Sequence, residues 1–159
     1  MRRAAGGFTL IELVVAITII AILAAVALPR YINLQSQARA AKAQAIFGAI
    51  RSAAALAKAQ CQIDLAGVNP AGATCTSVAG SVNMDGFLVA MVNQYPAATV
   101  PGIIAAAQLN PVTDGLTVIN GNPIVVQING GAVPNCQVSY REAPAPGVSP
   151  DFFIDTSRC

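Results

Sequence analysis

The sequence predicts an α+β protein in which a long N-terminal helix, membrane-spanning in its first half and amphipathic in its second, packs on a small C-terminal antiparallel β-sheet. Three observations predict this class. Residues 8–28 are almost wholly apolar, residues 30–58 repeat a polar side chain every seven positions, and the last third alternates short β-rich runs with turn pairs. A chain of 159 residues is long enough for one domain with its own core.

The apolar run from Phe8 to Leu28 contains thirteen Leu, Ile, Val or Phe side chains and one charge, Glu12. As a helix it would span about 31 Å, close to the thickness of a bilayer core. Thirteen large apolar residues at roughly −0.3 to −0.6 kcal/mol each outweigh the roughly +3 kcal/mol of one carboxylate at mid-bilayer, and Glu12 lies near the end. We therefore expect residues 8–28 to insert into a membrane.

A second helical pattern follows the apolar run without a break. Its polar face repeats every seven residues, at Arg30, Gln37, Gln44, Arg51 and Lys58. Another face is held by Leu34, Ala38, Ala45, Ala49 and Ala53, so we expect the helix to continue over residues 29–60. Pro29 removes one backbone hydrogen bond at the membrane boundary, and we expect it to kink the helix without ending it.

Residues 61–159 are predicted to form a globular head. Gly67, Pro70, Gly72 and Gly80 indicate a loop after Cys61, and a short helical stretch is expected near Gly102–Leu109. The candidate strands are Leu116–Ile119, Pro123–Ile128, Gln137–Arg141 and a last one near Phe152–Thr156. Asn120-Gly121, between two apolar runs, is the strongest hairpin signal.

All four cysteines lie in this head, at Cys61, Cys75, Cys136 and Cys159, and none forms a Cys-x-x-Cys pair. An even number of cysteines without the spacing of a metal site favours disulfides, which form in an oxidising compartment outside the cytoplasm. Three pairings are possible. The shortest loops favour Cys61 with Cys75 and Cys136 with Cys159, and the first of these closes a 15-residue loop worth about 3 kcal/mol.

The composition disfavours several classes of function. The chain has no histidine, which is the commonest general base and metal ligand, and no nucleophile and base at recognisable spacing, so no enzyme is expected. The net charge of +2 comes from Arg2 and Arg3, so no basic patch indicates nucleic acid. The late acids Asp114, Glu142, Asp151 and Asp155 lack the spacing of a calcium loop. We expect neither a metal nor a cofactor.

A short motif overlaps the start of the apolar run. It reads Gly6-Gly7-Phe8-Thr9-Leu10-Ile11-Glu12-Leu13 behind the basic pair Arg2 and Arg3. This combination resembles the prepilin cleavage site shared by type IV pilins and the pseudopilins of type II secretion. The resemblance implies a type IV pilin fold and removal of residues 1–7 by a prepilin peptidase. The cut would fall between Gly7 and Phe8, and the same enzyme would methylate the new amine of Phe8.

Glu12 and the amine of Phe8 would lie on one helix face, because positions i and i+4 are neighbours. An unpaired charge is costly in apolar surroundings, so each should seek the other, within one chain or between copies. The resemblance implies the second arrangement, in which Glu12 of an incoming subunit neutralises Phe8 of a subunit already in a filament. The alternative is that Glu12 only caps its own helix through the helix dipole, and both can hold in sequence.

Two further segments resemble one group of pilins. Residues 29–39 and the tail, 136–143 with 152–159, are similar to the mannose-sensitive haemagglutinin pilins, whose last strands a disulfide closes. This likeness implies a homopolymeric surface filament for adhesion, attachment or motility. Its precursor would reside in the inner membrane and need an assembly platform and an ATPase.

Other interpretations of the N-terminus remain. A pseudopilin in a periplasmic secretion filament is the main alternative to a surface pilus. An ordinary signal peptide could be cut after Ala27, although the apolar run is long for one and contains Glu12. A plain membrane anchor carrying an enzyme or binding head would leave the motif at residues 6–12 unexplained.

Overall fold

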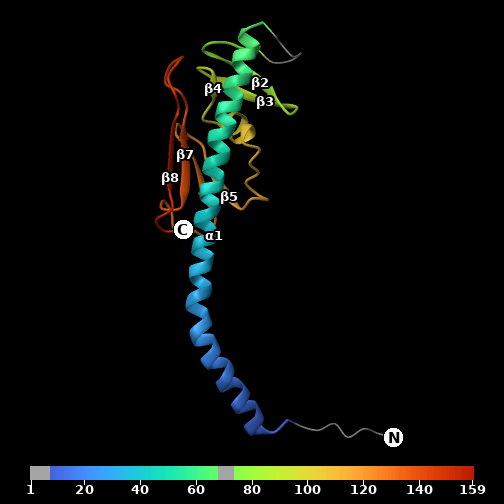
Figure 1. The fold of residues 1–159 in the computed structure, drawn as a ribbon, viewed down its shortest axis with the longest axis vertical. Coiled ribbons are helices and arrows are strands. Elements are labelled where there is room, and N and C mark those ends of the chain that lie inside the picture. The colour runs from blue at the N-terminus through green and yellow to red at the C-terminus, as the bar shows by residue number, and fades with distance from the viewer. Residues whose placement is uncertain (1–7, 68–73) are drawn as a thin grey trace, which may run out of the picture. The chain divides into compact units, whose positions relative to one another are not determined.

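The computed structural model describes residues 8–67 and 74–159 and has an α+β architecture (Figure 1). One helix, α1 (Leu10–Leu65), precedes eight strands arranged in two antiparallel four-stranded sheets. The α+β class is confirmed, with two sheets in place of the single one expected. The chain forms two compact units, one ending at Gln37 and one from Ala38 to Cys159, and α1 contributes to both.

In the first unit α1 is apolar on every side from Leu13 to Leu28. Each residue from Phe8 to Gln35 is exposed, because nothing else in this unit covers the helix. The helix continues through Pro29, so the proline does not end it. Whether Pro29 bends the helix in a filament stays a prediction.

In the second unit one face of α1 is buried. The buried residues repeat at intervals of three and four, at Ala43, Ile46, Ile50, Ala53, Ala54, Ala57 and Cys61. Five of these seven are Ala or Cys, and small side chains let the sheets approach the helix closely. The helix ends at Leu65, five residues beyond the expected end.

The second sheet is the one that the sequence pattern predicts. Its strands pair in the order β5 (Leu116–Ile119), β6 (Ile124–Ile128), β7 (Gln137–Arg141) and β8 (Asp151–Asp155). Alternate side chains of β6 and β7 face the core beside Ile46 and Ile50. The hairpin around Asn120-Gly121 is confirmed, and β6 begins one residue after Pro123, which has no N–H to donate to the ladder.

The first sheet was not predicted. It pairs β1 (Thr74–Cys75), β2 (Ala79–Met84), β3 (Phe87–Val92) and β4 (Tyr95–Pro96) in a region expected to be loop. A two-residue turn, Asp85-Gly86, joins β2 to β3 with φ angles of 50° and 86°. This sheet covers a separate small core beneath the last turns of α1. The short helical segment η1 (Val100–Ile104) overlaps the helical stretch expected from Gly102.

Two disulfides link the ends of these elements. Cys61, near the end of α1, is bonded to Cys75 in β1, and Cys136, before β7, is bonded to Cys159, with Cα separations of 5.3 and 4.8 Å. These are the pairs that the short-loop argument favours. A third link joins the two sheets, because the Tyr140 hydroxyl in β7 donates a hydrogen bond of 2.6 Å to the carbonyl of Pro96 in β4.

Candidate assembly surface on the N-terminal helix

The start of α1 is capped by Thr9. Its hydroxyl oxygen accepts the backbone N–H of Glu12 at 3.4 Å, and its hydroxyl donates to Oε2 of Glu12 at 3.3 Å. The backbone N–H of Leu13 completes the first turn by donating to the Thr9 carbonyl at 3.2 Å. Thr-x-x-Glu is the spacing of a capping box. Sequence analysis assigned Thr9 no role, although this four-residue signal was present.

Glu12 therefore lies in the first turn of its own helix, where the helix dipole favours a negative charge. The hydroxyl of Thr9 is a neutral partner, so it leaves the carboxylate charge uncompensated. Within the described residues, no ion pair joins a Lys or Arg side chain to an Asp or Glu side chain, although Arg39 donates a hydrogen bond to the backbone oxygen of Cys159. Glu12 is also the only charged residue between Phe8 and Pro29. The structure thus places one anionic group on an otherwise neutral helix.

Phe8 is the first described residue and precedes Glu12 by four positions, just before α1 begins. Its side chain is 78% exposed, and that of Leu10 is 80% exposed. Gly7 lies outside the described residues, so the structure does not place the peptide bond expected to be cut. The predicted cleavage between Gly7 and Phe8, and the methylation of Phe8, stay predictions.

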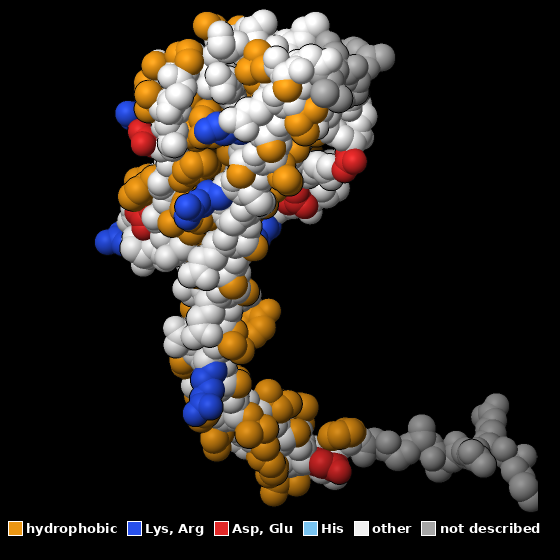
Figure 2. Space-filling view, turned by 45° about the horizontal axis from the view of Figure 1, so that its top comes forward, with side chains coloured by type: hydrophobic (Ala, Val, Ile, Leu, Met, Phe, Trp, Pro, Cys, Tyr) orange, Lys and Arg blue, Asp and Glu red, His pale blue; other side chains and the backbone are white. Residues whose placement is uncertain are grey.

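The exposed surface of α1 beyond Glu12 is largely apolar, shown in orange in Figure 2, and is interrupted by basic side chains shown in blue. The exposed large side chains on it are Leu13, Val14, Val15, Ile17, Ile19, Ile20, Ile22, Leu23, Val26, Leu28, Tyr31, Ile32 and Leu34. Its one additional polar group in the first turns, the hydroxyl of Thr18, donates to the carbonyl of Val15 at 2.8 Å. By length and composition, α1 is the one helix in the described part of the chain that could cross a membrane.

A helix that is apolar all round needs an apolar environment on every side. Lipid provides one, and a bundle of identical helices provides another. The arrangement can therefore do two things chemically. It can hold the subunit in a bilayer, and it can bury the same surface against other copies while Glu12 finds a cationic partner.

The sequence comparisons concern this same N-terminal segment. The family described as the prokaryotic N-terminal methylation motif matches residues 2–28. The type IV narrow pilus major component PilA5 of Thermus thermophilus is 52% identical over 56 residues. The N-terminal region of this chain is similar to that of a type IV pilin. The match to the Thermus pilin covers 35% of this chain and 48% of that protein, so the chain spans about half the length of the curated relative it matches.

No solved structure matches this chain. The closer likeness to the mannose-sensitive haemagglutinin group stays a prediction. Within residues 8–67 and 74–159 there is no group of three or more His, Cys, Asp or Glu side chains that could hold a metal ion.

Proposed function

We propose that this chain is a structural subunit of a type IV pilus-like filament. It is made as an inner-membrane precursor, cut between Gly7 and Phe8 by a prepilin peptidase, methylated at Phe8, and polymerised through α1. The observation that carries the proposal is the fully exposed apolar half of α1 with a single carboxylate in its first turn. The methylation motif matched over residues 2–28 and the Thermus pilus component support it.

The energetics favour a transfer from lipid to protein. The apolar side chains of residues 8–34 are equally satisfied by acyl chains and by neighbouring helices, so this surface alone gives little preference for the filament. The charge of Glu12 supplies the preference. In lipid it has only the hydroxyl of Thr9, whereas in a filament the amine of a neighbouring Phe8 can neutralise it.

Removal from the membrane requires work, which we assign to a cytoplasmic ATPase acting through an assembly platform. A surface pilus serving adhesion, attachment or motility is our first choice, because the matched relative is a major pilus component. A pseudopilin of a type II secretion system is the second, because the same N-terminal motif would serve both.

Mass and N-terminal peptide analysis of two fractions tests this proposal. Material sheared from the cell surface should contain a chain that begins at methylated Phe8 and has two disulfides. The same species confined to the membrane fraction would favour the pseudopilin alternative. A chain that begins at Leu28 would contradict the filament proposal, because a signal peptidase would then have removed the polymerisation surface.

The role of Glu12 can be separated from its role as a cap. Glu12→Gln keeps an oxygen that accepts the Thr9 hydroxyl and removes the charge. We expect this variant, as the sole subunit, to be cut and methylated normally but to be lost from the sheared fraction.

Thr9→Ala is the matched control, because it removes the cap at a cost of about 1 kcal/mol and keeps the charge. It should still assemble. Normal assembly of Glu12→Gln would refute the charge-pairing account, and loss of both variants would assign the effect to the helix start instead.

A further inference from the structure

A cleft beside α1 in the head holds two cations against aromatic rings. It has a volume of about 270 Å³ and lies between α1 and the start of β8, with Tyr95 and Ser149 in its wall. The Arg51 guanidinium carbon lies 5.8 Å from the ring centre of Phe152, and Nζ of Lys58 lies 4.6 Å from the ring centre of Tyr95. Arg51 and Lys58 are two helical turns apart, so both face the same cleft.

These two cations have no anionic partner within the described residues. Arg51 packs over rings, and Lys58 donates a hydrogen bond of 2.8 Å to the neutral hydroxyl of Tyr95. That hydrogen bond lowers the pKa of Tyr95, as expected where a positive charge favours the tyrosinate. The cleft is therefore an electropositive, aromatic-walled site with room for an acidic group.

The tip of the β2–β3 hairpin carries the opposite charge. Asp85 lies in the turn, is exposed, and makes neither a hydrogen bond nor an ion pair to any other described residue. The turn itself is closed by Asn83, whose side-chain oxygen accepts the N–H of Gly86 at 2.9 Å. Phe87 and Leu88 follow, and are 58% and 57% exposed. The tip thus presents a carboxylate next to two apolar side chains.

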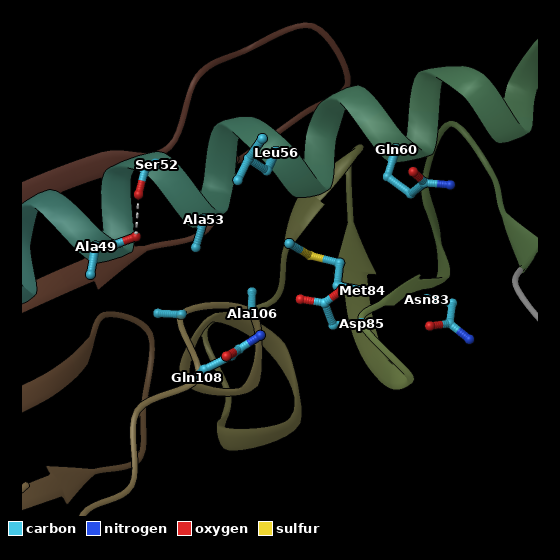
Figure 3. A pocket seen from close by; sticks show the side chains of 11 residues that line it. Ala49, Ser52, Ala53, Leu56, Gln60, Asn83, Met84, Asp85, Ala106 and Gln108 are labelled. Atoms are coloured by element: carbon cyan, nitrogen blue, oxygen red, sulfur yellow. Dashed lines mark hydrogen bonds between the residues drawn. The ribbon is translucent and has the colours of Figure 1, made fainter.

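The tip projects from the other side of α1. A groove of about 440 Å³ lies between the hairpin and the helix, with Leu56 and Gln60 of α1 in one wall and Met84 and Asp85 of the hairpin in the other (Figure 3). The α1 residues that line this groove and those that line the cationic cleft centre on helix faces about half a turn apart. Figure 1 shows the same relation, with the β2–β3 hairpin and the strands β7 and β8 on opposite sides of α1.

Basic and acidic residues are also unevenly distributed along the sequence. From Arg30 to Lys58 the helix carries five basic residues and no acid, whereas residues 85–155 carry five acids and one basic residue, Arg141. Because no described pair joins them within a copy, complementary charges remain available between copies. Two different surfaces on opposite sides of one subunit make a head-to-tail contact, which generates an open helical assembly where its rotation does not close into a ring.

We propose that the β2–β3 hairpin tip of one copy docks into the cationic cleft of the next copy in the filament. Asp85 lies between Arg51 and Lys58, and Phe87 packs toward the aromatic wall of the cleft. This inference rests on the proposed function, because it describes how the heads of a homopolymer meet. A convex, acidic tip and a concave, basic cleft are complementary in shape and charge.

Zero-length carbodiimide cross-linking of sheared wild-type filaments tests the contact directly. The reagent joins a carboxylate to a primary amine, and Lys42 and Lys58 are the only lysines in the chain. We expect covalent dimers and longer ladders whose peptides join Asp85 to Lys58. Lys58→Arg keeps the charge and removes the amine, so it should abolish this link, whereas Lys42→Arg should not. Filaments that lack an Asp85–Lys58 peptide would overturn the proposal.

Charge reversal provides a second test with its own rescue. Asp85→Lys should lower the yield of filaments at least about tenfold, because every subunit then repeats a like-charge contact. Combining it with Arg51→Glu and Lys58→Glu should restore the yield. Asp151→Lys is the control, because Asp151 is exposed on the β8 face opposite Phe152.

The two proposals fail in different ways. If wild-type cells make no filament from this chain, the proposed function is wrong. If wild-type filaments form but Asp85→Lys assembles as well as Asp151→Lys, the filament stands and the hairpin contact is refuted.

Discussion

The hydrogen bond between the two sheets predicts a measurable loss of stability in Tyr140→Phe. The side chain of Tyr140 is 1% exposed, and its hydroxyl is the donor to the Pro96 carbonyl. The substitution keeps the ring, and with it the contact to the Phe152 ring at 5.4 Å between centres, so it creates no large cavity. It removes a hydrogen bond and leaves a buried carbonyl without this donor. The free energy of unfolding should fall by about 1–3 kcal/mol.

The assay is urea unfolding of the full chain in detergent with its disulfides intact. The midpoint should fall while the slope stays unchanged, and the melting temperature should fall by roughly 3–12 °C. Tyr31→Phe is the control, because Tyr31 is 60% exposed and its hydroxyl makes no hydrogen bond in the described structure. A midpoint equal to that of wild type would refute the reasoning.

The pH dependence gives an independent check on the same side chain. Burial, assisted by the nearby charge of Glu142, raises the pKa of Tyr140 above its ordinary value of about 10. A raised folded-state pKa gives stability that is complete below pH 10 and is lost as the pH rises further, because the unfolded chain ionises first. At pH 10.5 the free energy of unfolding of wild type should therefore be lower by about 0.8 kcal/mol than at neutral pH, and Tyr140→Phe should not show this decrease. A stability gap that stays constant from pH 8 to pH 10.5 would contradict this account.

Three further predictions address other parts of the head. Replacing Cys61 and Cys75 with serine should lower the free energy of unfolding by about 3 kcal/mol. Non-reducing peptide mapping of wild type should recover the Cys61 and Cys75 peptides joined by a disulfide, and a different pairing would refute this prediction. Lys58→Met should raise the pKa of Tyr95, since the Lys58 hydrogen bond is the main cause of its lowering, and a tyrosinate absorbance titration that does not move would contradict it. Ile50→Ala should cost about 2–5 kcal/mol in urea unfolding because Ile50 is 1% exposed, and a change below about 1 kcal/mol would show that the core collapses around the gap.

Local pattern was sufficient to predict α1 and the second sheet. The helix follows from its apolar start and from the polar repeat of seven residues between Arg30 and Lys58. Its buried face was misplaced, because Ala38 and Ala45 are exposed and only Ala53 of the expected apolar face is buried. The strands β5 and β6 follow from short apolar runs on either side of Asn120-Gly121. In both cases the type of element is visible in its own sequence, so long-range contacts were not needed to predict it. Which face of the helix is buried depends on the sheets that pack against it.

The first sheet was not predicted because its strands lack a clear alternation of branched apolar and polar residues. β2 reads Ala79-Gly-Ser-Val-Asn-Met84, with one inward-facing branched residue, Val82. β3 is a continuous apolar run, which cannot be distinguished from a buried helix by periodicity. The pairing of β2 with β3 depends on the small core beneath the first sheet, where Val82 and Val89 pack with buried residues near the end of α1. Asp85-Gly86 is a hairpin signal that would have revealed the turn.

The functional residues can also be divided into those that the local sequence predicts and those that only the fold brings together. Phe8 and Glu12 could be identified because the motif is contiguous in sequence. The cap by Thr9 was equally local and was overlooked. The cationic cleft could not be predicted, because Lys58 and Tyr95 are 37 residues apart in the chain and are brought together only by the fold of the first sheet.

The Cys61–Cys75 disulfide has a mechanical consequence. A subunit loaded along α1 would yield first where the helix leaves the core, from Ala38 onward, and each residue drawn out of the helix lengthens the chain by about 2 Å. At Cys61 the load passes through a covalent bond into β1, so unravelling stops after roughly 45 Å. The disulfide therefore sets how far a subunit can stretch, and a cysteine placed one turn earlier would shorten that reach by about 7 Å.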